Sequence, residues 1–250
     1  MATVSAMLPG SLTRSVRPSN GNCGLRRMKS KYPVGPFDEW ADSYDHSVAS
    51  AQGFPHEGYE KVLCRVVQEA NPRPGMRILD LGVGTGNLAE RFLSVGCKVW
   101  GIDFSKNMLD KARRKLPTAI LMQTDLLDGW PVEMQIRFNR VVSTYALHHF
   151  DLNAKRRLVV RVSRQYLAQD GVIVIGDISF PTAQARVEFR KSLGNVWDDE
   201  EVYWAGDETI AAFTEAGLRT EYIQISTCGG VYIISAPTPP YQVRLMLKRC

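Results

Sequence analysis

The stretch from Met76 to Ser105, MRILDLGVGTGNLAERFLSVGCKVWGIDFS, constrains the fold of this chain more than any other part. An apolar run ends at Asp80, glycines follow at positions 82, 84 and 86, a helical pattern comes next, and a second apolar run ends at Asp103. Glycine accepts unusual backbone angles and lets a ligand approach the main chain, and the start of a helix offers unpaired N–H groups. The stretch therefore predicts a strand, a ligand-binding turn, a helix and a second strand.

The same alternation continues along the chain and predicts a doubly wound α/β fold. We expect strands at 77–81, 98–103, 119–124, 140–145 and 171–178, and helices at 59–67, 87–95, 106–116 and 153–167. Ser105 is placed to cap the helix at 106–116. Strands separated by helices favour a parallel sheet covered on both faces.

The C-terminal part follows a different pattern. Asp207 is placed to cap a helix that Gly217 ends. Two alternating runs follow, at 219–226 and 230–236, with a short turn containing Gly229 and Gly230 between them. This pattern predicts an antiparallel hairpin added to the parallel sheet.

The acidic residues narrow the choice of ligand. Asp103 ends the second strand, where a carboxylate can accept hydrogen bonds from the hydroxyls of a ribose, a feature shared with nicotinamide enzymes. Asp80 lies two residues before the first glycine and would repel a pyrophosphate, but would attract an ammonium or a sulfonium. Asp125 follows the third strand and can accept from an exocyclic amine, or cap a helix. Together they favour a cationic nucleoside without phosphate.

These motifs carry a resemblance. ILDLGVGTGN, GIDFS, QTDLLDG and VVSTYALHHF resemble the successive motifs of class I S-adenosylmethionine-dependent methyltransferases, in particular small uncharacterised bacterial enzymes of the YrrT type, over roughly Phe37 to Ala236. The resemblance implies a Rossmann-like, seven-stranded, mostly parallel sheet in the order 3-2-1-4-5-7-6, with helices on both faces and the C-terminal hairpin. It implies S-adenosyl-L-methionine as cofactor.

Candidate site residues follow from the motifs and the resemblance. The expected cofactor-binding residues are Gly82, Gly84, Gly86, Asp80, Asp103, Phe104, Asp125, Leu126, Ser143 and Tyr44. Phe104 flanks an adenine or packs in the core, and Tyr44, like Trp40, belongs to a cofactor lid or to a core stripe. Tyr145 and His149 are the candidates for handling the acceptor, and only one of His148 and His149 is expected to face the crevice. His149 equally fits a structural role.

The expected domain organisation is simple. Residues 37–236 form one methyltransferase domain, with a helical cap at 37–75 and a substrate-side insertion at 178–206, followed by a tail at 237–250. Residues 1–36 are expected to be a disordered extension; a transit peptide and a translation start at Met28 are the alternatives. Residues 1–37 carry six basic residues and no acid, more than the whole net charge of +5, so the remaining residues are at −1. This excludes charge as an argument for nucleic-acid binding.

The predicted function is methyl transfer to a small-molecule acceptor by a cytoplasmic monomer or homodimer, without a nucleic-acid or membrane partner. Five scattered cysteines fit a reducing compartment. No histidine–acid spacing typical of a metal site is visible, so no metal is expected. The aromatic residues of the 178–206 insertion either line an apolar pocket or cover the sheet. A non-catalytic cofactor-binding protein is the alternative, and a nicotinamide oxidoreductase is disfavoured by Asp80 and Asp125.

Overall fold

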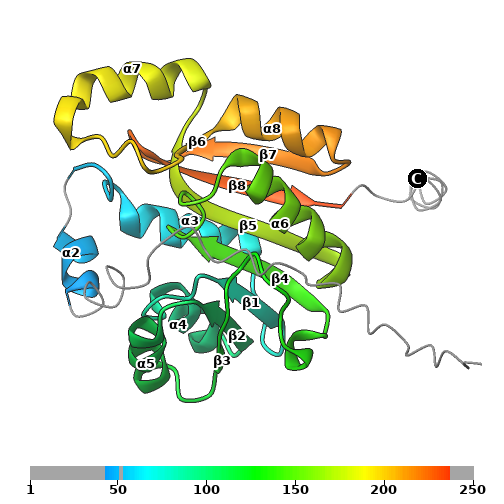
Figure 1. Cartoon of the computed structure of the whole chain (residues 1–250). Helices are drawn as coiled ribbons and strands as arrows, with labels where there is room; N and C mark the ends of the chain where they lie inside the picture. The colour runs from blue at the N-terminus through cyan, green and yellow to red at the C-terminus, as the bar shows by residue number, and fades with distance from the viewer. Residues whose placement is uncertain (1–42, 51–52, 237–250) are drawn as a thin grey trace, which may run out of the picture.

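A computed structural model of the chain describes residues 43–50 and 53–236. Its centre is a sheet with the strand order β3-β2-β1-β4-β5-β8-β7 (Figure 1). The strands are β1 (Arg77–Leu81), β2 (Lys98–Asp103), β3 (Ile120–Gln123), β4 (Phe138–Thr144), β5 (Leu167–Phe180), β7 (Arg219–Gln224) and β8 (Gly229–Ser235). Counted without the short β6 (Trp204–Ala205), which pairs with the end of β5, this is the predicted order.

The first five strands are parallel, and the last two run antiparallel to their neighbours. β1 pairs in parallel with β2 and β4, so Asp80 lies opposite Gly101 and Val142. β8 pairs antiparallel with both β5 and β7. The predicted hairpin is therefore confirmed and closes one end of the sheet.

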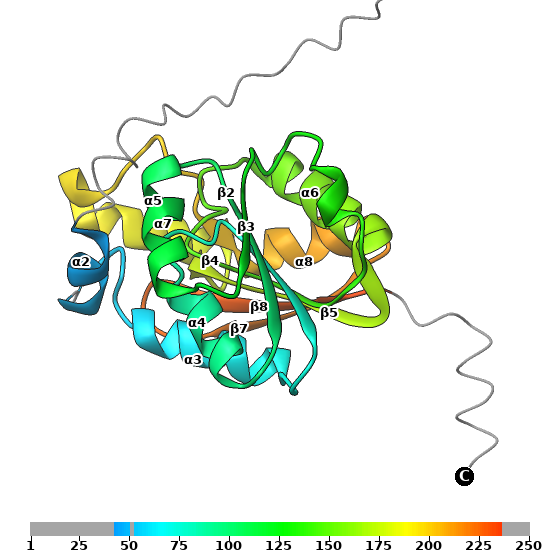
Figure 2. The ribbon, with the colours of Figure 1, turned by 90° about the horizontal axis from the view of Figure 1, so that it is seen from below.

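Helices cover both faces of the sheet (Figures 1 and 2). One apolar cluster holds the buried sides of α3 (Tyr59–Ala70), α4 (Asn87–Ser94) and α5 (Lys106–Lys115). The second holds those of α6 (Leu152–Gln165) and α8 (Gly206–Glu215). Each helix buries one stripe and leaves the other side to solvent, as expected for helices on a doubly wound sheet.

The remaining elements lie on the side of the molecule to which the parallel strands point. They are the helices α2 (Tyr44–Ser50) and α7 (Ala183–Leu193) and the 3-10 turn η2 (Gly194–Val196) (Figure 1). A second 3-10 turn, η1 (Val132–Met134), lies between β3 and β4. The predicted extension at 1–36, the tail at 237–250 and the start of the cap, including Phe37 and Trp40, lie outside the described residues.

Several local predictions can be compared with the structure. Ser105 caps α5, because its hydroxyl accepts from the Met108 N–H at 3.2 Å. Gly217 follows α8 with a φ of 79°, as a helix-ending glycine should. The prediction that Asp207 caps this helix was wrong. α8 begins at Gly206, directly after β6, so Asp207 is its second residue, and its carboxylate accepts from the Ala183 N–H at 3.0 Å and from the Glu208 N–H at 2.7 Å.

The turn of the hairpin was also placed wrongly. Gly229 and Gly230 belong to β8, and the chain reverses between Gln224 and Gly229. A Cβ at Gly230 would lie 2.5 Å from the Tyr222 ring. The absence of a side chain at Gly230 therefore lets the Tyr222 ring pack against β8, a contact that cannot be predicted from the sequence pattern.

Candidate active site

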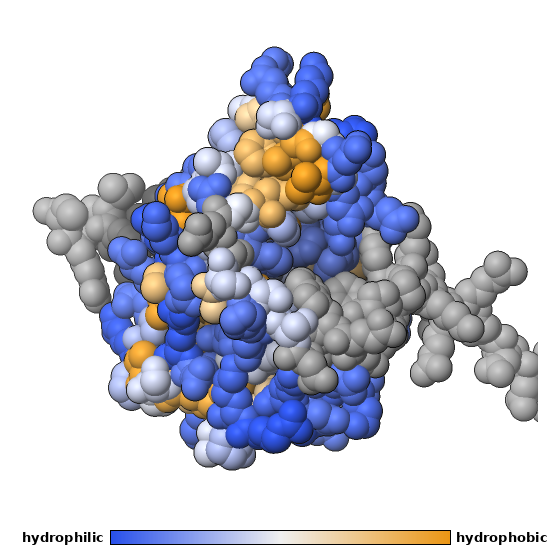
Figure 3. Space-filling model, turned by 90° about the vertical axis from the view of Figure 1, so that its left-hand side faces the viewer, coloured by the Kyte–Doolittle hydropathy of each residue, from blue (hydrophilic) through white to orange (hydrophobic). Residues whose placement is uncertain are grey.

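A cavity of about 530 Å³ lies at the carboxyl ends of the parallel strands. It is bounded by the loops after β1, β2, β3 and β4, by α2 and residues 54–59, and by residues 196–203. Figure 3 views the molecule from this side and shows an apolar patch above a hollow. Crevices at this end of a doubly wound sheet are the usual place for a ligand.

The three glycines of the first turn have different reasons to be glycine. All three have positive φ, with values of 72° at Gly82, 54° at Gly84 and 91° at Gly86. A Cβ at Gly82 would lie 2.3 Å from the Cβ of Ala146, and one at Gly86 would lie 2.6 Å from Leu116. At Gly84 no atom lies within 4 Å, and the residue lines the cavity. Of the three glycines, only Gly84 both lines the cavity and has open space where a side chain would stand, so its backbone is accessible to a ligand.

Asp103 connects the second strand to this turn. Its carboxylate accepts from the Gly84 N–H at 2.8 Å and from the Ser105 N–H at 2.9 Å, while the residue still lines the cavity. Phe104, Asp125 and Leu126 line the same part of the cavity. Asp125 accepts from the Leu127 N–H at 2.8 Å and so caps a turn, not a helix.

Asp80, Gly86 and Ser143 do not line the cavity. Ser143 is fully buried and donates to the Leu81 carbonyl at 2.7 Å, which ties β4 to β1. Asp80 lies beneath the turn with 1% of its surface exposed, and neither carboxylate oxygen has a hydrogen-bond partner among the described residues. Burial, followed by the nearby charge of Asp103, holds the pKa of Asp80 well above its usual value.

The helix α2 is attached to the glycine turn through Asp45. The Asp45 carboxylate accepts from the Thr85 hydroxyl at 2.6 Å, from the Asn87 amide at 3.0 Å and from the Lys115 ammonium at 3.2 Å. Burial raises the pKa of Asp45, but these three donors outweigh it and keep the pKa below its usual value. Tyr44, the first residue of α2, lines the cavity and also packs against the apolar cluster of α3 to α5, so it has both of the contacts that the sequence left open.

Tyr145 follows β4 in an unusual conformation. Its φ is 50°, which is rare for a residue with a side chain, and its ring lies 5.1 Å from that of Tyr59 and 5.4 Å from that of His56. The hydroxyl is buried without a hydrogen-bond partner in the described part of the chain, and burial raises its pKa. The residue lines the cavity, so this conformation presents an aromatic ring to any ligand there.

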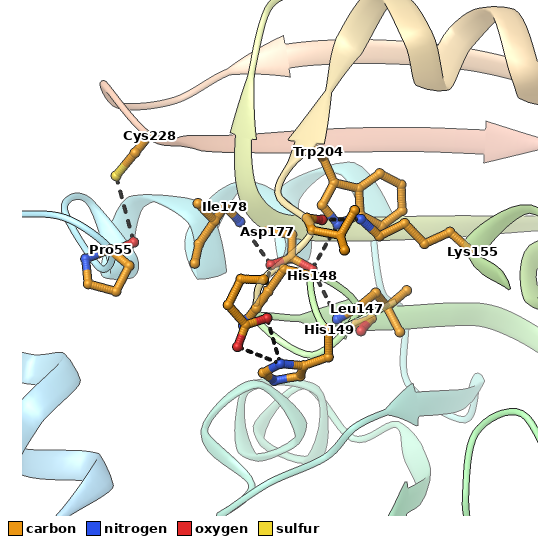
Figure 4. A network of polar contacts seen from close by, with 12 residues as sticks. Pro55, Leu147, His148, His149, Lys155, Asp177, Ile178, Trp204 and Cys228 are labelled. Carbon is orange, nitrogen blue, oxygen red and sulfur yellow. Dashed lines mark hydrogen bonds and ion pairs between the residues drawn. The ribbon is translucent and has the colours of Figure 1, made fainter. Parts of the chain in front are cut away.

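A buried carboxylate orients His148 (Figure 4). Asp177, at the end of β5, accepts from Nδ1 of His148 at 2.6 Å and also from the backbone N–H groups of Leu147 and Ile178 and from the Trp204 indole. Burial by itself raises the pKa of Asp177, but the opposing effects of His148, Lys155 and the Ile178 N–H are larger, so the pKa lies below its usual value. Nδ1 of His148 is thus committed to Asp177, and Nε2 is the nitrogen left for the cavity that the ring lines.

A second carboxylate, that of Glu201, holds His149. Its Nδ1 lies 2.8 Å from the nearer carboxylate oxygen of Glu201. Both His148 and His149 line the cavity, with ring centroids 4.2 Å apart, so the prediction that only one of them faces the crevice was wrong. Residues 145–150 form an irregular turn, not a helix or strand, and neighbouring side chains need not diverge there.

Aromatic residues from two distant segments meet above the histidines. Phe54 lies 5.7 Å from the Trp197 ring and stacks on it, and the Tyr203 ring meets Phe54 edge-on at 5.5 Å. Phe54 and Tyr203 line the cavity, whereas Phe189 and Trp197 pack behind them. Of the aromatic residues of the insertion, Tyr203 therefore lines the pocket, whereas Phe189 and Trp197 pack outside it, so both alternatives that the sequence left open occur.

Sequence reasoning missed Asp177, Glu201 and the segment from Phe54 to His56. Asp177 had a signal, because it stands in the GDIS motif at the end of a predicted strand, as Asp103 does in GIDFS. Glu201 is one of four consecutive acids at 198–201 and had none.

Comparisons with known proteins agree on the fold. The profile of a methyltransferase domain matches residues 78–171. An uncharacterised methyltransferase of Geobacillus sp. is 34% identical over 207 residues, which cover 76% of this chain and 92% of the relative. One from Geobacillus kaustophilus is 32% identical over 202 residues, 75% of this chain and 89% of the relative.

Solved structures support the same conclusion at lower identity. The DhpI–SAH complex superposes with a TM-score of 0.63 at 17% identity, over 82% of this chain and 96% of the other. Magnesium protoporphyrin IX methyltransferase from Synechocystis, with bound SAH, superposes with a TM-score of 0.62 at 14% identity, over 82% of this chain and 100% of the other.

Within the described residues, no helix has both the length and the apolar character that crossing a membrane requires.

Proposed function

The chain belongs to the class I S-adenosylmethionine-dependent methyltransferases, and we propose that it transfers the methyl group to a small molecule held in the same cavity as the cofactor. One observation carries this proposal. A single cavity reaches from Gly84 and Asp103 to His148, His149 and Tyr203. Its size is that of ordinary small-molecule sites, and both ends contain groups suited to binding.

The first half of the cavity fits S-adenosylmethionine. The backbone at Gly84 is open to a ligand, and the carboxylate of Asp103, which accepts from the Gly84 and Ser105 N–H groups, lines the cavity where ribose hydroxyls would lie. Asp125, Phe104 and Leu126 surround the place of the adenine, and Tyr44 covers the site from α2. Asp80 lies beneath this turn and does not line the cavity, and its burial favours the neutral acid, so the binding groups of this half are Gly84, Asp103 and the residues around them.

The second half of the cavity is the proposed acceptor site. The described part of the 37–75 cap provides Phe54 and His56 there, and the 178–206 insertion provides Val196, Glu201 and Tyr203. The bound cofactor supplies an activated methyl group. The chain must align the acceptor, exclude water and handle a proton where one is released. Tyr145 and His149 are the candidates for holding the acceptor, since both line the cavity.

A small acceptor is favoured over a macromolecule for two reasons. The chain beyond residue 37 has a net charge of −1, so it lacks the excess of positive charge that binding nucleic acid requires. Phe54 and Tyr203 line the cavity together with the histidines, and their rings meet edge-on at 5.5 Å. This leaves room for a small group but hinders a polymer.

Calorimetric titration of the purified chain tests the cofactor site. We expect S-adenosylmethionine and S-adenosylhomocysteine to bind and a nicotinamide dinucleotide not to bind. Asp103→Asn should weaken binding by about 2 kcal/mol, the usual range for a hydrogen bond to a charged group. Asp110→Asn, on the exposed side of α5, is the matched control and should bind like the wild type.

Formation of S-adenosylhomocysteine over a panel of acceptors tests the transfer. The panel contains small alcohols, phenols, carboxylic acids, amines and thiols, together with tRNA and an unfolded peptide. Turnover with one small-molecule class supports the proposal. Turnover only with tRNA or peptide would overturn the choice of acceptor, and tight cofactor binding without turnover on any member would favour a non-catalytic binding protein.

A further inference from the structure

The cavity holds a group of side chains that the proposed cofactor site does not use. We infer that His148, His149 and Glu201 form a binding site for one divalent transition-metal ion. Each offers a ligand atom, and these three atoms all lie within 4.8 Å of one another. They come from the turn after β4 and from the segment before β6, and all three residues line the acceptor half of the cavity.

The distances are close to those that an ion requires. Zinc binds imidazole nitrogen and carboxylate oxygen at about 2.0–2.2 Å, so two neighbouring ligand atoms on one ion are separated by roughly 3–3.5 Å. Nδ1 of His149 and the nearer Glu201 oxygen are 2.8 Å apart, a hydrogen-bond distance that must widen by only a few tenths of an ångström, roughly, to reach this range. The widest separation, 4.8 Å, exceeds it by about an ångström, within reach of a small rotation of an imidazole ring.

A simple ion pair accounts for only part of this arrangement. An ion pair explains why His149 and Glu201 lie together. It does not explain why the ring of His148 lies beside them, with its centroid 4.2 Å from that of the His149 ring. Nδ1 of His148 is held by Asp177 at 2.6 Å, so Nε2 is the available ligand. A carboxylate behind a histidine is the outer support that metal-binding histidines commonly have, because it fixes the tautomer and the ring orientation.

This support is itself rigid. Asp177 is fully buried and accepts from the Leu147 and Ile178 N–H groups and from the Trp204 indole (Figure 4). Side-chain exposure is only 10% at His148, 13% at His149 and 20% at Glu201. The donor atoms are therefore held in place before any ion binds, and little ordering is left for binding to bring about.

The donor set selects the type of ion. Two imidazoles and one carboxylate suit zinc, iron(II), cobalt(II) or manganese(II), whereas magnesium and calcium prefer oxygen ligands. Three protein ligands leave a coordination position towards the cavity. An ion there would favour the deprotonated form of an oxygen or sulfur nucleophile, a consequence that rests on the proposed function; binding of the ion does not. The inference replaces the expectation from the sequence that no metal takes part.

Titration of the metal-stripped full chain with Zn²⁺, followed by calorimetry, tests the inference. We expect one ion per chain at this site and at least tenfold weaker binding of Mg²⁺. Glu201→Gln removes one ligand charge with little change in size and should weaken Zn²⁺ binding by at least the 10–100-fold that loss of an outer-shell partner costs. Glu200→Gln, the same change one residue away on the surface, is the control and should bind like the wild type.

A Co²⁺ titration followed by visible absorption identifies the ligands. We expect a spectrum of nitrogen and oxygen coordination without a sulfur-to-metal band, lost in Glu201→Gln. If that variant does not melt like the wild type, His149→Gln provides the same comparison. No binding, equal binding in the ligand variants, or a thiolate spectrum would overturn the inference. S-adenosylmethionine binding is measured on the same metal-free protein, so a failure of the metal site and a failure of the cofactor site are separate results.

Discussion

Two glycines of one turn, two residues apart, should respond to the same substitution in different ways. At Gly82 an alanine Cβ would overlap Ala146 at 2.3 Å, whereas at Gly84 it would meet no atom of the described structure within 4 Å and would point into the cavity. Both positions carry the cost of a positive φ, about 1–2 kcal/mol for a residue with a side chain.

We therefore expect Gly84→Ala to lose about 1–2 kcal/mol of stability and most of its affinity for S-adenosylmethionine, because the methyl group occupies ligand space. Gly82→Ala should lose clearly more stability, since it must also displace the turn after β4. Urea unfolding and calorimetry measure both quantities for both variants. Equal loss of stability, with cofactor affinity kept in Gly84→Ala, would contradict the assignment of Gly84.

His56, a half-buried histidine on the wall of the cavity, makes the free energy of unfolding depend on pH. Burial, followed by the charge of His148, lowers the pKa of His56 from 6.5 to about 4. Between these values the unfolded chain binds a proton that the folded chain does not. The contribution of neutral His56 to the free energy of unfolding is therefore complete above pH 6.5 and is lost as the pH falls towards 4.

His56→Gln should remove this part of the pH dependence, roughly 2–3 kcal/mol between pH 7 and pH 4. The free energy of unfolding, measured by urea titration at several pH values, checks it. His46→Gln, on the exposed part of α2, is the control and should keep the wild-type slope. An unchanged slope in His56→Gln would show that His56 does not carry the effect.

At the scale of elements, α2 depends on one side chain for its place over the glycine turn. Asp45 links it to Thr85, Asn87 and Lys115, which belong to the turn after β1 and to α4 and α5. Its side chain is 49% exposed, so this network contributes little to global stability. Its effect should be local, on the position of α2 and of Tyr44.

Asp45→Ala should therefore lower the melting temperature only slightly, speed amide hydrogen exchange in 44–50, and weaken S-adenosylmethionine binding by about 1 kcal/mol. Asp110→Ala is the matched control, since Asp110 pairs only with Lys106 and Arg113 of its own helix among the ion pairs that the structure describes. If both variants exchange and bind like the wild type, Asp45 does not hold α2 in place.

At the scale of the whole molecule, two apolar clusters share one sheet. Phe92 of α4 lies in one cluster and Phe138 of β4 in the other, and both are fully buried. Because the strands between them contribute side chains to both faces, loss of packing on one face should destabilise the other.

We expect Phe92→Ala and Phe138→Ala each to cost about 3–5 kcal/mol and to lower a single melting transition. Calorimetric scanning with far-ultraviolet circular dichroism checks that the transitions coincide. Two separate transitions in either variant would show that the two faces unfold independently.

Features that depend on residues close together in the sequence could be predicted, and features that depend on residues far apart in the sequence could not. The alternation of strands and helices and the Ser105 cap could be predicted from the residues, because glycine turns, apolar periodicity and capping residues act over a few positions. The order of the strands came from the resemblance to the methyltransferase motifs. The two-residue β6 could not, since it exists only through pairing with the end of β5. In the cavity, Gly84 and Asp103 were predicted from local motifs, whereas the approach of Glu201 to His149, 52 residues apart, depends on how two irregular segments pack.

The two ends of the cavity are encoded differently in the chain, and this has an evolutionary consequence. The proposed donor end uses mostly one continuous stretch, residues 82–126, whereas the proposed acceptor end is assembled from three separate segments around 54–59, 144–150 and 196–203. Substitutions in the loops at 54–58 and 196–202 can accumulate without disturbing the strand ends of the proposed donor end. A lineage can thus inherit its methyl donor and change its acceptor, and exchanging residues 181–203 between relatives should transplant acceptor preference while the donor stays the same.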